Sequence, residues 1–171
     1  MMIYCENLLR LDGKEAEIQR FVGQAKRKNE EIETDFSFQK FLPVPEYLES
    51  DPIQEERWWI DNWGIWGDVE ALYDEQRQAY QFTVEDNGEP PIRGLFAISK
   101  RFPYIRFTLE YYKFQDEKND LATRGRIEFQ NGEPLSEKEC RVQVIRCQCC
   151  RSIKSYKRIK QSGNSIDAGR V

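Results

Sequence analysis

The chain has 171 residues, of which 39% are hydrophobic and 33% are charged, proportions typical of one soluble folded domain rather than of a disordered segment. It contains no histidine, which excludes nucleophile triads, metal sites and general bases that depend on imidazole. No apolar run approaches the roughly 20 residues of a membrane span, and the first residues lack the pattern of a signal peptide. We therefore expect a cytoplasmic protein without a transmembrane segment.

The charge is unevenly distributed along the chain. Residues 1–140 carry 18 basic and 29 acidic side chains, whereas residues 141–171 carry 8 basic side chains and 1 acidic side chain. The net charge of −4 therefore conceals an acidic body and a basic end. This contrast is the strongest compositional signal in the chain and indicates interaction with charged partners.

The first part of the chain predicts two strands and two helical segments. A strand is expected over residues 3–11 and a helix over residues 14–28. The apolar positions of that helix share one face: Ile18, Phe21, Val22 and Ala25. Alternating phenylalanines followed by two prolines predict a strand over residues 36–45. Residues 46–63 are typical of a short helical insertion.

The next part predicts a hairpin, a helix and two strands. The hairpin pairs residues 68–74 with residues 79–86. The helix follows Pro91 and ends before Pro103. Its expected buried positions are Ile92, Leu95, Phe96 and Ile98. Strict alternation predicts a strand over residues 104–114, and residues 123–132 form the last expected strand.

This order of elements predicts an α+β fold. Two helices on one face of an antiparallel sheet give the ferredoxin-like, split βαβ arrangement. The prediction includes the tryptophan-rich helical insertion and a basic C-terminal extension. We place the ferredoxin-like domain at residues 1–134 and the extension at residues 135–171.

The extension predicts an amphipathic helix over about residues 137–160. Ser136 and Glu139 have the spacing of a capping box, and one stripe of the helix would be apolar. The alternation of residues 141–145 favours a strand instead. The basic side chains are candidates for binding nucleic acid, an anionic membrane or a partner protein, or form a solvated face: Arg146, Arg151, Lys154, Lys157, Arg158 and Lys160.

Two sets of residues are candidate metal ligands. Four cysteines lie close together in sequence, at positions Cys140, Cys147, Cys149 and Cys150. Their spacing departs from the paired knuckles of a zinc site, so inert or oxidation-prone thiols are the favoured interpretation. Asp68 and Glu70 alternate on a predicted strand and could hold a divalent cation, although solvated carboxylates are the default. We expect no cofactor.

All four tryptophans lie within residues 57–68. Trp59 and Trp63 are four positions apart, on one helical face, and are expected to pack in the core. Trp66 is expected to begin the next strand. Trp58 is out of phase with Trp59, so it is predicted to be the most exposed of the four and a candidate partner-binding residue.

Four blocks of the sequence, IYCENLLRLDGKEAEIQRF, FSFQKFLPVPE, WWIDNWGIWGD and FPYIRFTLEYY, resemble the YubB-like ferredoxin-fold family, which is carried by plasmids, phages and other mobile elements. The shared positions are Cys5, Asn7, Pro43, Pro45, Trp59, Asn62, Trp63 and Gly64. The resemblance covers about residues 2–132. It implies the ferredoxin-like fold but carries over no catalytic residue.

Together with the charge distribution, this resemblance implies a non-enzymatic binding protein of a mobile element, which engages a host protein or nucleoprotein complex. One form is a counter-defence protein whose acidic surface imitates nucleic acid. One alternative is an accessory protein that binds nucleic acid through the basic extension. Another is a metal-dependent enzyme with a carboxylate site. Residues 77–85 share only Arg77, Tyr80 and Phe82 with the RNA-binding strand of RRM domains, and an acidic body repels phosphate.

Overall fold

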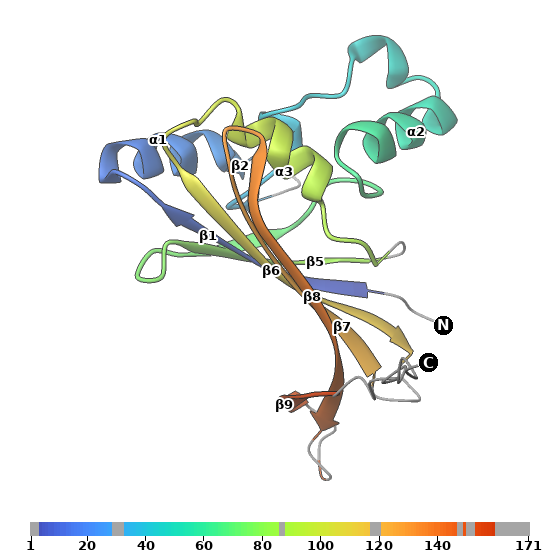
Figure 1. Cartoon of the computed structure of the whole chain (residues 1–171). Coiled ribbons are helices and arrows are strands. Elements are labelled where there is room, and N and C mark those ends of the chain that lie inside the picture. The colour runs from blue at the N-terminus through green and yellow to red at the C-terminus, as the bar shows by residue number, and fades with distance from the viewer. Residues whose placement is uncertain are drawn as a thin grey trace, which may run out of the picture.

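The computed structural model describes residues 4–28, 33–85, 88–116, 121–146, 149 and 153–159. Within them, the chain forms an α+β structure with a large antiparallel sheet, and α-helices lie on one side of that sheet (Figure 1). The α+β class predicted from the sequence is therefore confirmed. None of the helices described is long and apolar enough to cross a membrane.

The sheet has seven strands in the order β4-β5-β1-β6-β7-β8-β9, and every neighbouring pair is antiparallel. The strands are β1 (Tyr4–Asp12), β4 (Ala71–Asp74), β5 (Ala79–Val84), β6 (Arg106–Asp116), β7 (Leu121–Gln130), β8 (Glu133–Arg146) and β9 (Ile153–Arg158). A separate two-stranded ribbon contains β2 (Arg27–Lys28) and β3 (Glu33–Thr34). Strand β1 thus lies between β5 and β6.

Three α-helices pack above this sheet: α1 (Glu15–Ala25), α2 (Pro52–Asn62) and α3 (Ile92–Ser99) (Figure 1). Two short 3-10 turns, η1 (Phe38–Lys40) and η2 (Glu46–Leu48), precede α2. Helix α2 begins where Asp51 accepts a hydrogen bond from the backbone N–H of Gln54, and Pro52 occupies its first turn. The predicted helical insertion is therefore confirmed.

The helix-side core lies between the helices and the sheet, with Phe21 of α1 among its central rings. Phe21 stacks on Phe41 at 5.1 Å between ring centroids and meets the edges of Phe102 and Phe107. Aromatic rings in these geometries gain energy beyond the area that they bury. The predicted buried face of the first helix is confirmed at all four positions: Ile18, Phe21, Val22 and Ala25.

The predicted strand over residues 36–45 is wrong. This segment contains η1, yet Phe36, Phe38 and Phe41 are all buried in the helix-side core. The aromatic rings therefore point inward from an irregular backbone. Hydrogen bonds to Asp68 take the place of strand pairing in this segment: its carboxylate accepts one from the Ser37 hydroxyl and one from the Phe38 N–H.

The predicted helix over residues 137–160 is also wrong. Strand β8 pairs with β7 from Glu133 to Gln143, and β9 pairs with β8. Val142 and Val144 are buried while Arg141 and Gln143 are exposed, which is the period of two of a strand. Long-range pairing thus outweighed the capping-box spacing, and residues 123–132 do not form the last strand.

The far end of the sheet curls toward the face that carries no helix. Two strands separate β6 from β9, and neighbouring strands are about 4.8 Å apart, yet the rings of Tyr112 in β6 and Tyr156 in β9 stack at 4.0 Å. The Tyr156 hydroxyl also donates to the carboxylate of Glu6 in β1, at 3.4 Å. This curl encloses a second, open-face core of Phe114, Ala122, Val142 and Val144.

Candidate nucleic-acid interface

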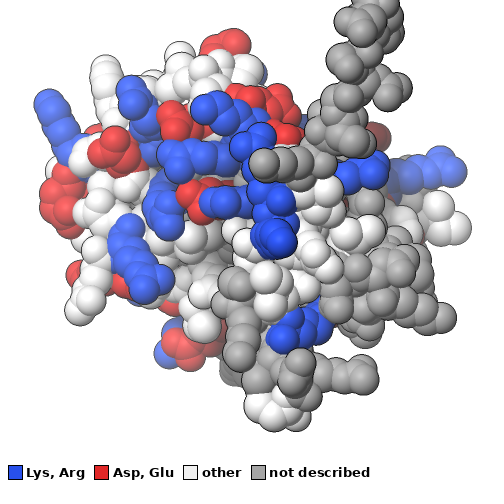
Figure 2. Space-filling view, turned by 60° about the horizontal axis from the view of Figure 1, so that its bottom comes forward, with Lys and Arg blue, Asp and Glu red and all other residues white. Residues whose placement is uncertain are grey.

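The open face of the sheet, turned away from the helices, gathers basic side chains from three adjacent strands. Residues opposite each other in antiparallel strands share a face. Arg124 lies opposite Cys140, and Arg126 lies opposite Lys138. A shallow hollow of about 200 Å³ lies among them, lined by Arg124, Gly125, Arg126, Lys138, Glu139, Cys140 and Arg158. Figure 2 shows lysine and arginine side chains gathered on this side of the molecule, interleaved with acidic ones.

Two of these arginines are held in place by neighbouring side chains. Arg126 donates to Glu110 at 3.2 Å and to Glu128 at 2.7 Å. The guanidinium of Arg124 lies 5.6 Å from the centre of the Tyr112 ring, within the range of a cation–π contact. These contacts reduce the side-chain entropy that binding an anion would otherwise cost.

The other two cations of the hollow carry no such restraint. Within the part of the chain that the structure describes, neither Lys138 nor Arg158 forms an ion pair. Their charges are therefore not neutralised by a protein carboxylate within ion-pair distance. An anion seated in the hollow would meet two fixed and two free cations.

Two tyrosines lie next to the basic hollow: Tyr112 contacts Arg124, and the ring of Tyr156 stacks on Tyr112. Burial raises the pKa of Tyr112 and of Tyr156 above the usual value. Burial also raises the pKa of Glu6, although the hydrogen bond from Tyr156 and the charge of Arg146 partly offset this effect. A second hollow of about 270 Å³ is lined in part by Glu6, Tyr112 and Tyr156.

The basic residues predicted from the sequence are only partly brought together. Arg158 lines the hollow, and the charge of Arg146 acts on Glu6. Lys157 is exposed and follows the strand alternation to the other face. The side chain of Lys154, and the residues Arg151 and Lys160, lie outside the described structure. The sequence interpretation missed three cations: Arg124, Arg126 and Lys138. Alternation along residues 121–146 was the signal that could have found them.

Trp58 is not the exposed tryptophan. Its ring packs at 5.6 Å against Trp63, which is fully buried. Trp66 is the exposed one, at 56% of its surface, and it precedes β4 by several residues instead of beginning it. The predicted exposure of Trp58 is wrong because the rings of Trp58 and Trp59, at successive helical positions, both pack against the ring of Trp63.

The predicted metal sites gain no support from the geometry. Among the residues described, no three cysteine, aspartate or glutamate side chains form a group suited to a metal ion. Cys140 borders the basic hollow and Cys149 is exposed, whereas Cys147 and Cys150 lie outside the described residues. Asp68 accepts hydrogen bonds from three donors and pairs with Arg27 at 3.4 Å, which favours a structural role.

Comparison with protein-family models, with curated proteins and with solved structures finds no match to this chain.

Proposed function

We propose that this protein binds single-stranded nucleic acid through the open face of its sheet. The observation that carries the proposal is the group of four cations on three adjacent strands around one hollow, at Arg124, Arg126, Lys138 and Arg158. Lysine and arginine bind phosphates and release counterions. The side chains stand on strands of a sheet, which positions them more rigidly than loops would.

The acidic charge of the rest of the molecule favours phosphate binding at this face over binding elsewhere. Residues 46–62, which contain η2 and α2, carry six acidic side chains and one basic side chain. A phosphate chain is repelled there and attracted to the β7–β9 end. The sequence alone suggested that the acidic body argues against nucleic-acid binding. We infer instead that the acidic body restricts such binding to the β7–β9 end of the molecule.

The proposed fold family is consistent with this function. We infer that β1, α1, β4, β5, α3 and β6 form a ferredoxin-like unit, supported by the order β4-β5-β1-β6. In RNA-binding sheets of this kind the strand face receives the bases. We further propose that the chain is a non-enzymatic YubB-like protein of a mobile element, acting on nucleic acid in a nucleoprotein complex.

Fluorescence anisotropy with a labelled 12-residue oligo-dT, over a series of NaCl concentrations, tests the proposal. The log of the affinity is expected to fall linearly with the log of the salt concentration. Replacing Lys138 and Arg158 together by glutamine removes the two unpaired cations. We expect an affinity at least tenfold weaker at 50 mM NaCl, and a salt slope smaller by about 1.4, since each lost phosphate contact removes about 0.7 for a single strand.

The matched control is Lys28→Gln, which removes one exposed charge at the other end of the molecule. It should change the affinity less than twofold. A duplex of the same length tests the preference for single strands. The proposal is wrong if the wild-type chain does not bind the oligonucleotide at 20 mM NaCl, or if Lys28→Gln weakens binding as much as the double variant does.

A further inference from the structure

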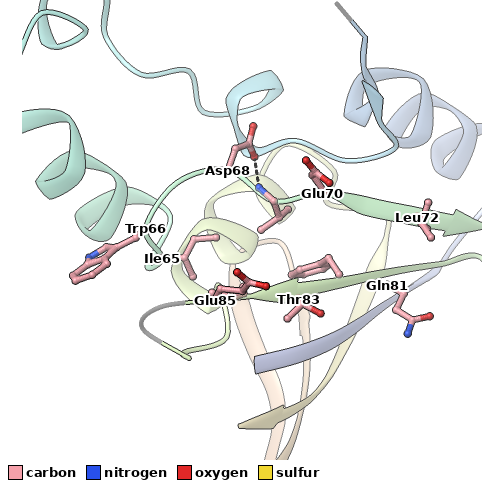
Figure 3. A pocket seen from close by; sticks show the side chains of 11 residues that line it. Ile65, Trp66, Asp68, Glu70, Leu72, Gln81, Thr83 and Glu85 are labelled. Carbon is pink, nitrogen blue, oxygen red and sulfur yellow. Dashed lines mark hydrogen bonds between the residues drawn. The ribbon is translucent and has the colours of Figure 1, made fainter. Parts of the chain in front are cut away.

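A larger concave surface lies toward the opposite edge of the sheet, between β5 and the chain that leads into β4. This groove has a volume of about 710 Å³. Figure 3 shows Thr83 in β5 and Glu85 just after it, Glu70 and Leu72 along the facing chain, and Trp66 at one end. The groove is separate from the basic hollow and shares none of its lining residues.

The groove exposes part of a strand edge. The ladder between β4 and β5 ends at the pair Ala71–Phe82, whereas the ladder between β1 and β5 continues to Cys5–Val84. Thr83 and Val84 therefore have a strand neighbour on one side only. An extended peptide can add to such an edge as a further strand.

The rest of this sheet edge is already covered by the chain itself. The N–H of Asp35 donates to the carbonyl of Ala71 at 3.0 Å. The Asp35 carboxylate accepts from the N–H of Tyr73 at 2.9 Å. Covering an edge in this way prevents unwanted strand pairing. Among the residues that the structure describes along β4 and β5, the stretch of β5 at the groove is therefore an open position.

Large apolar side chains flank the groove and remain exposed. Trp66 is 56% exposed and Leu72 is 76% exposed. Trp66 also borders a neighbouring hollow of about 260 Å³, together with Ile53 and Ile60. Gly64 and Gly67 adopt positive φ angles of 82° and 78° on either side of Trp66, a backbone that other residues rarely accept. The turn therefore presents the indole outward instead of letting it collapse onto the core.

The ionisable side chains that line the groove are all carboxylates: Asp68, Glu70 and Glu85. Asp68 is occupied by its own hydrogen bonds. In the described ranges, Glu70 and Glu85 form no ion pair. Two unpaired carboxylates beside an exposed indole are complementary to a cationic, partly apolar ligand.

We propose that this groove docks an extended basic segment of a partner protein. The segment adds as a strand beside Thr83 and Val84 and directs lysine or arginine side chains to Glu70 and Glu85. It places one apolar side chain against Trp66 at one end of the groove and another against Leu72 at the other end. Trp66 is the expected anchor, because exposed tryptophans in apolar surroundings are frequent hot spots of protein interfaces. The inference is independent of nucleic-acid binding, since it uses the other edge of the sheet.

Selection of random 12-residue peptides displayed on phage, against the immobilised full chain, tests the proposal whatever the identity of the partner. We expect the enriched peptides to carry net positive charge and to contain apolar residues at alternating positions. The enriched peptides, synthesised with a fluorophore, are then titrated with variants of the protein. Trp66→Ala should weaken binding at least tenfold, and the double variant Glu70→Lys/Glu85→Lys should do the same.

The matched control is Tyr47→Ala, which removes an exposed aromatic ring outside the groove. It should leave the affinity within twofold of wild type. Thermal unfolding of each variant verifies that the fold is retained, as expected for exposed positions. Absence of enrichment, enrichment of acidic peptides, or binding that survives Trp66→Ala would each overturn the proposal.

Discussion

The helix-side core is a large cluster of aromatic and aliphatic side chains between the helices and the sheet, whereas the open-face core consists of four side chains with tyrosines packed against them. Phe21 alone contacts five other aromatic rings. In the open-face core, Tyr156 reaches Tyr112 and Phe114 from an edge strand. The first core therefore defines the fold, while the second holds the curled end of the sheet in position.

The two regions also differ in charge. The helical segment 46–62 is acidic, and residues 121–159 carry nine basic and four acidic side chains. The strand-built region keeps a face free of helices, and there the cations gather. We therefore propose the region with the smaller core, and not the helical segment, as the region that binds phosphate.

The largest expected effect of a substitution is in the helix-side core. Phe21→Ala should lower the free energy of unfolding by about 3–5 kcal/mol, because the cavity is surrounded by rings that cannot collapse into it. Val144→Ala, in the open-face core, should lower it by only about 1–2 kcal/mol. Urea unfolding followed by circular dichroism measures both values.

Hydrogen exchange sharpens this comparison. Val144→Ala is expected to speed amide exchange in β8 and β9 while leaving β1 and β5 protected, since local openings are confined to weakly packed units. Equal destabilisation by the two substitutions, or faster exchange throughout the sheet of Val144→Ala, would show that the two cores unfold as one.

A second, smaller effect is expected at Asp68. Asp68→Ala leaves the Ser37 hydroxyl and the backbone N–H groups of Phe38 and Val69 without their acceptor. The free energy of unfolding should fall by about 1–3 kcal/mol. Glu70→Gln, at an exposed neighbour, should cost less than about 0.5 kcal/mol. Unfolding experiments on the two variants measure both losses of stability, and repeating them with Mg²⁺ tests for a metal site. A stabilisation by Mg²⁺ that Asp68→Ala removes would support a metal site instead of a structural role for Asp68.

Local periodicity could predict the elements in which apolar residues fall on one face and polar residues on the other. The first strand, the helix with Phe21, and the hairpin of β4 and β5 follow the apolar pattern of the sequence. The C-terminal strands could not be predicted with the same rule, because the capping-box spacing and the alternation of residues 141–145 favour different structures. Pairing with β7, the strand that precedes β8 in the chain, decided between them.

The candidate sites were harder to predict than the fold. Arg158 was a candidate. Alternation along residues 121–146 indicates which side chains share a face, but it does not indicate that Arg124 and Lys138 lie beside Arg158, because that depends on the register of the strands. Gly125 shows the same limit, since a Cβ there would clash with the Tyr111 ring on the neighbouring strand. Cross-strand neighbours, more than residue types, determine what each position does.

The smallest expected effect concerns Glu6, the carboxylate beside the open-face core. Burial raises its pKa in the folded state, so folding favours the protonated form. Stability therefore falls as the pH rises from about 4.3, the usual value for glutamate, through the raised pKa, and then levels off. Glu6→Gln keeps an oxygen that accepts from Tyr156 and removes the charge. The variant should match wild type at pH 4 and exceed it by less than about 1 kcal/mol at pH 7. Denaturation at intervals between these pH values, with Glu70→Gln as the control, measures the difference. A gap that is constant with pH, or a variant less stable at pH 7, would mean that the paired charge of Glu6 stabilises the curl instead of opposing it.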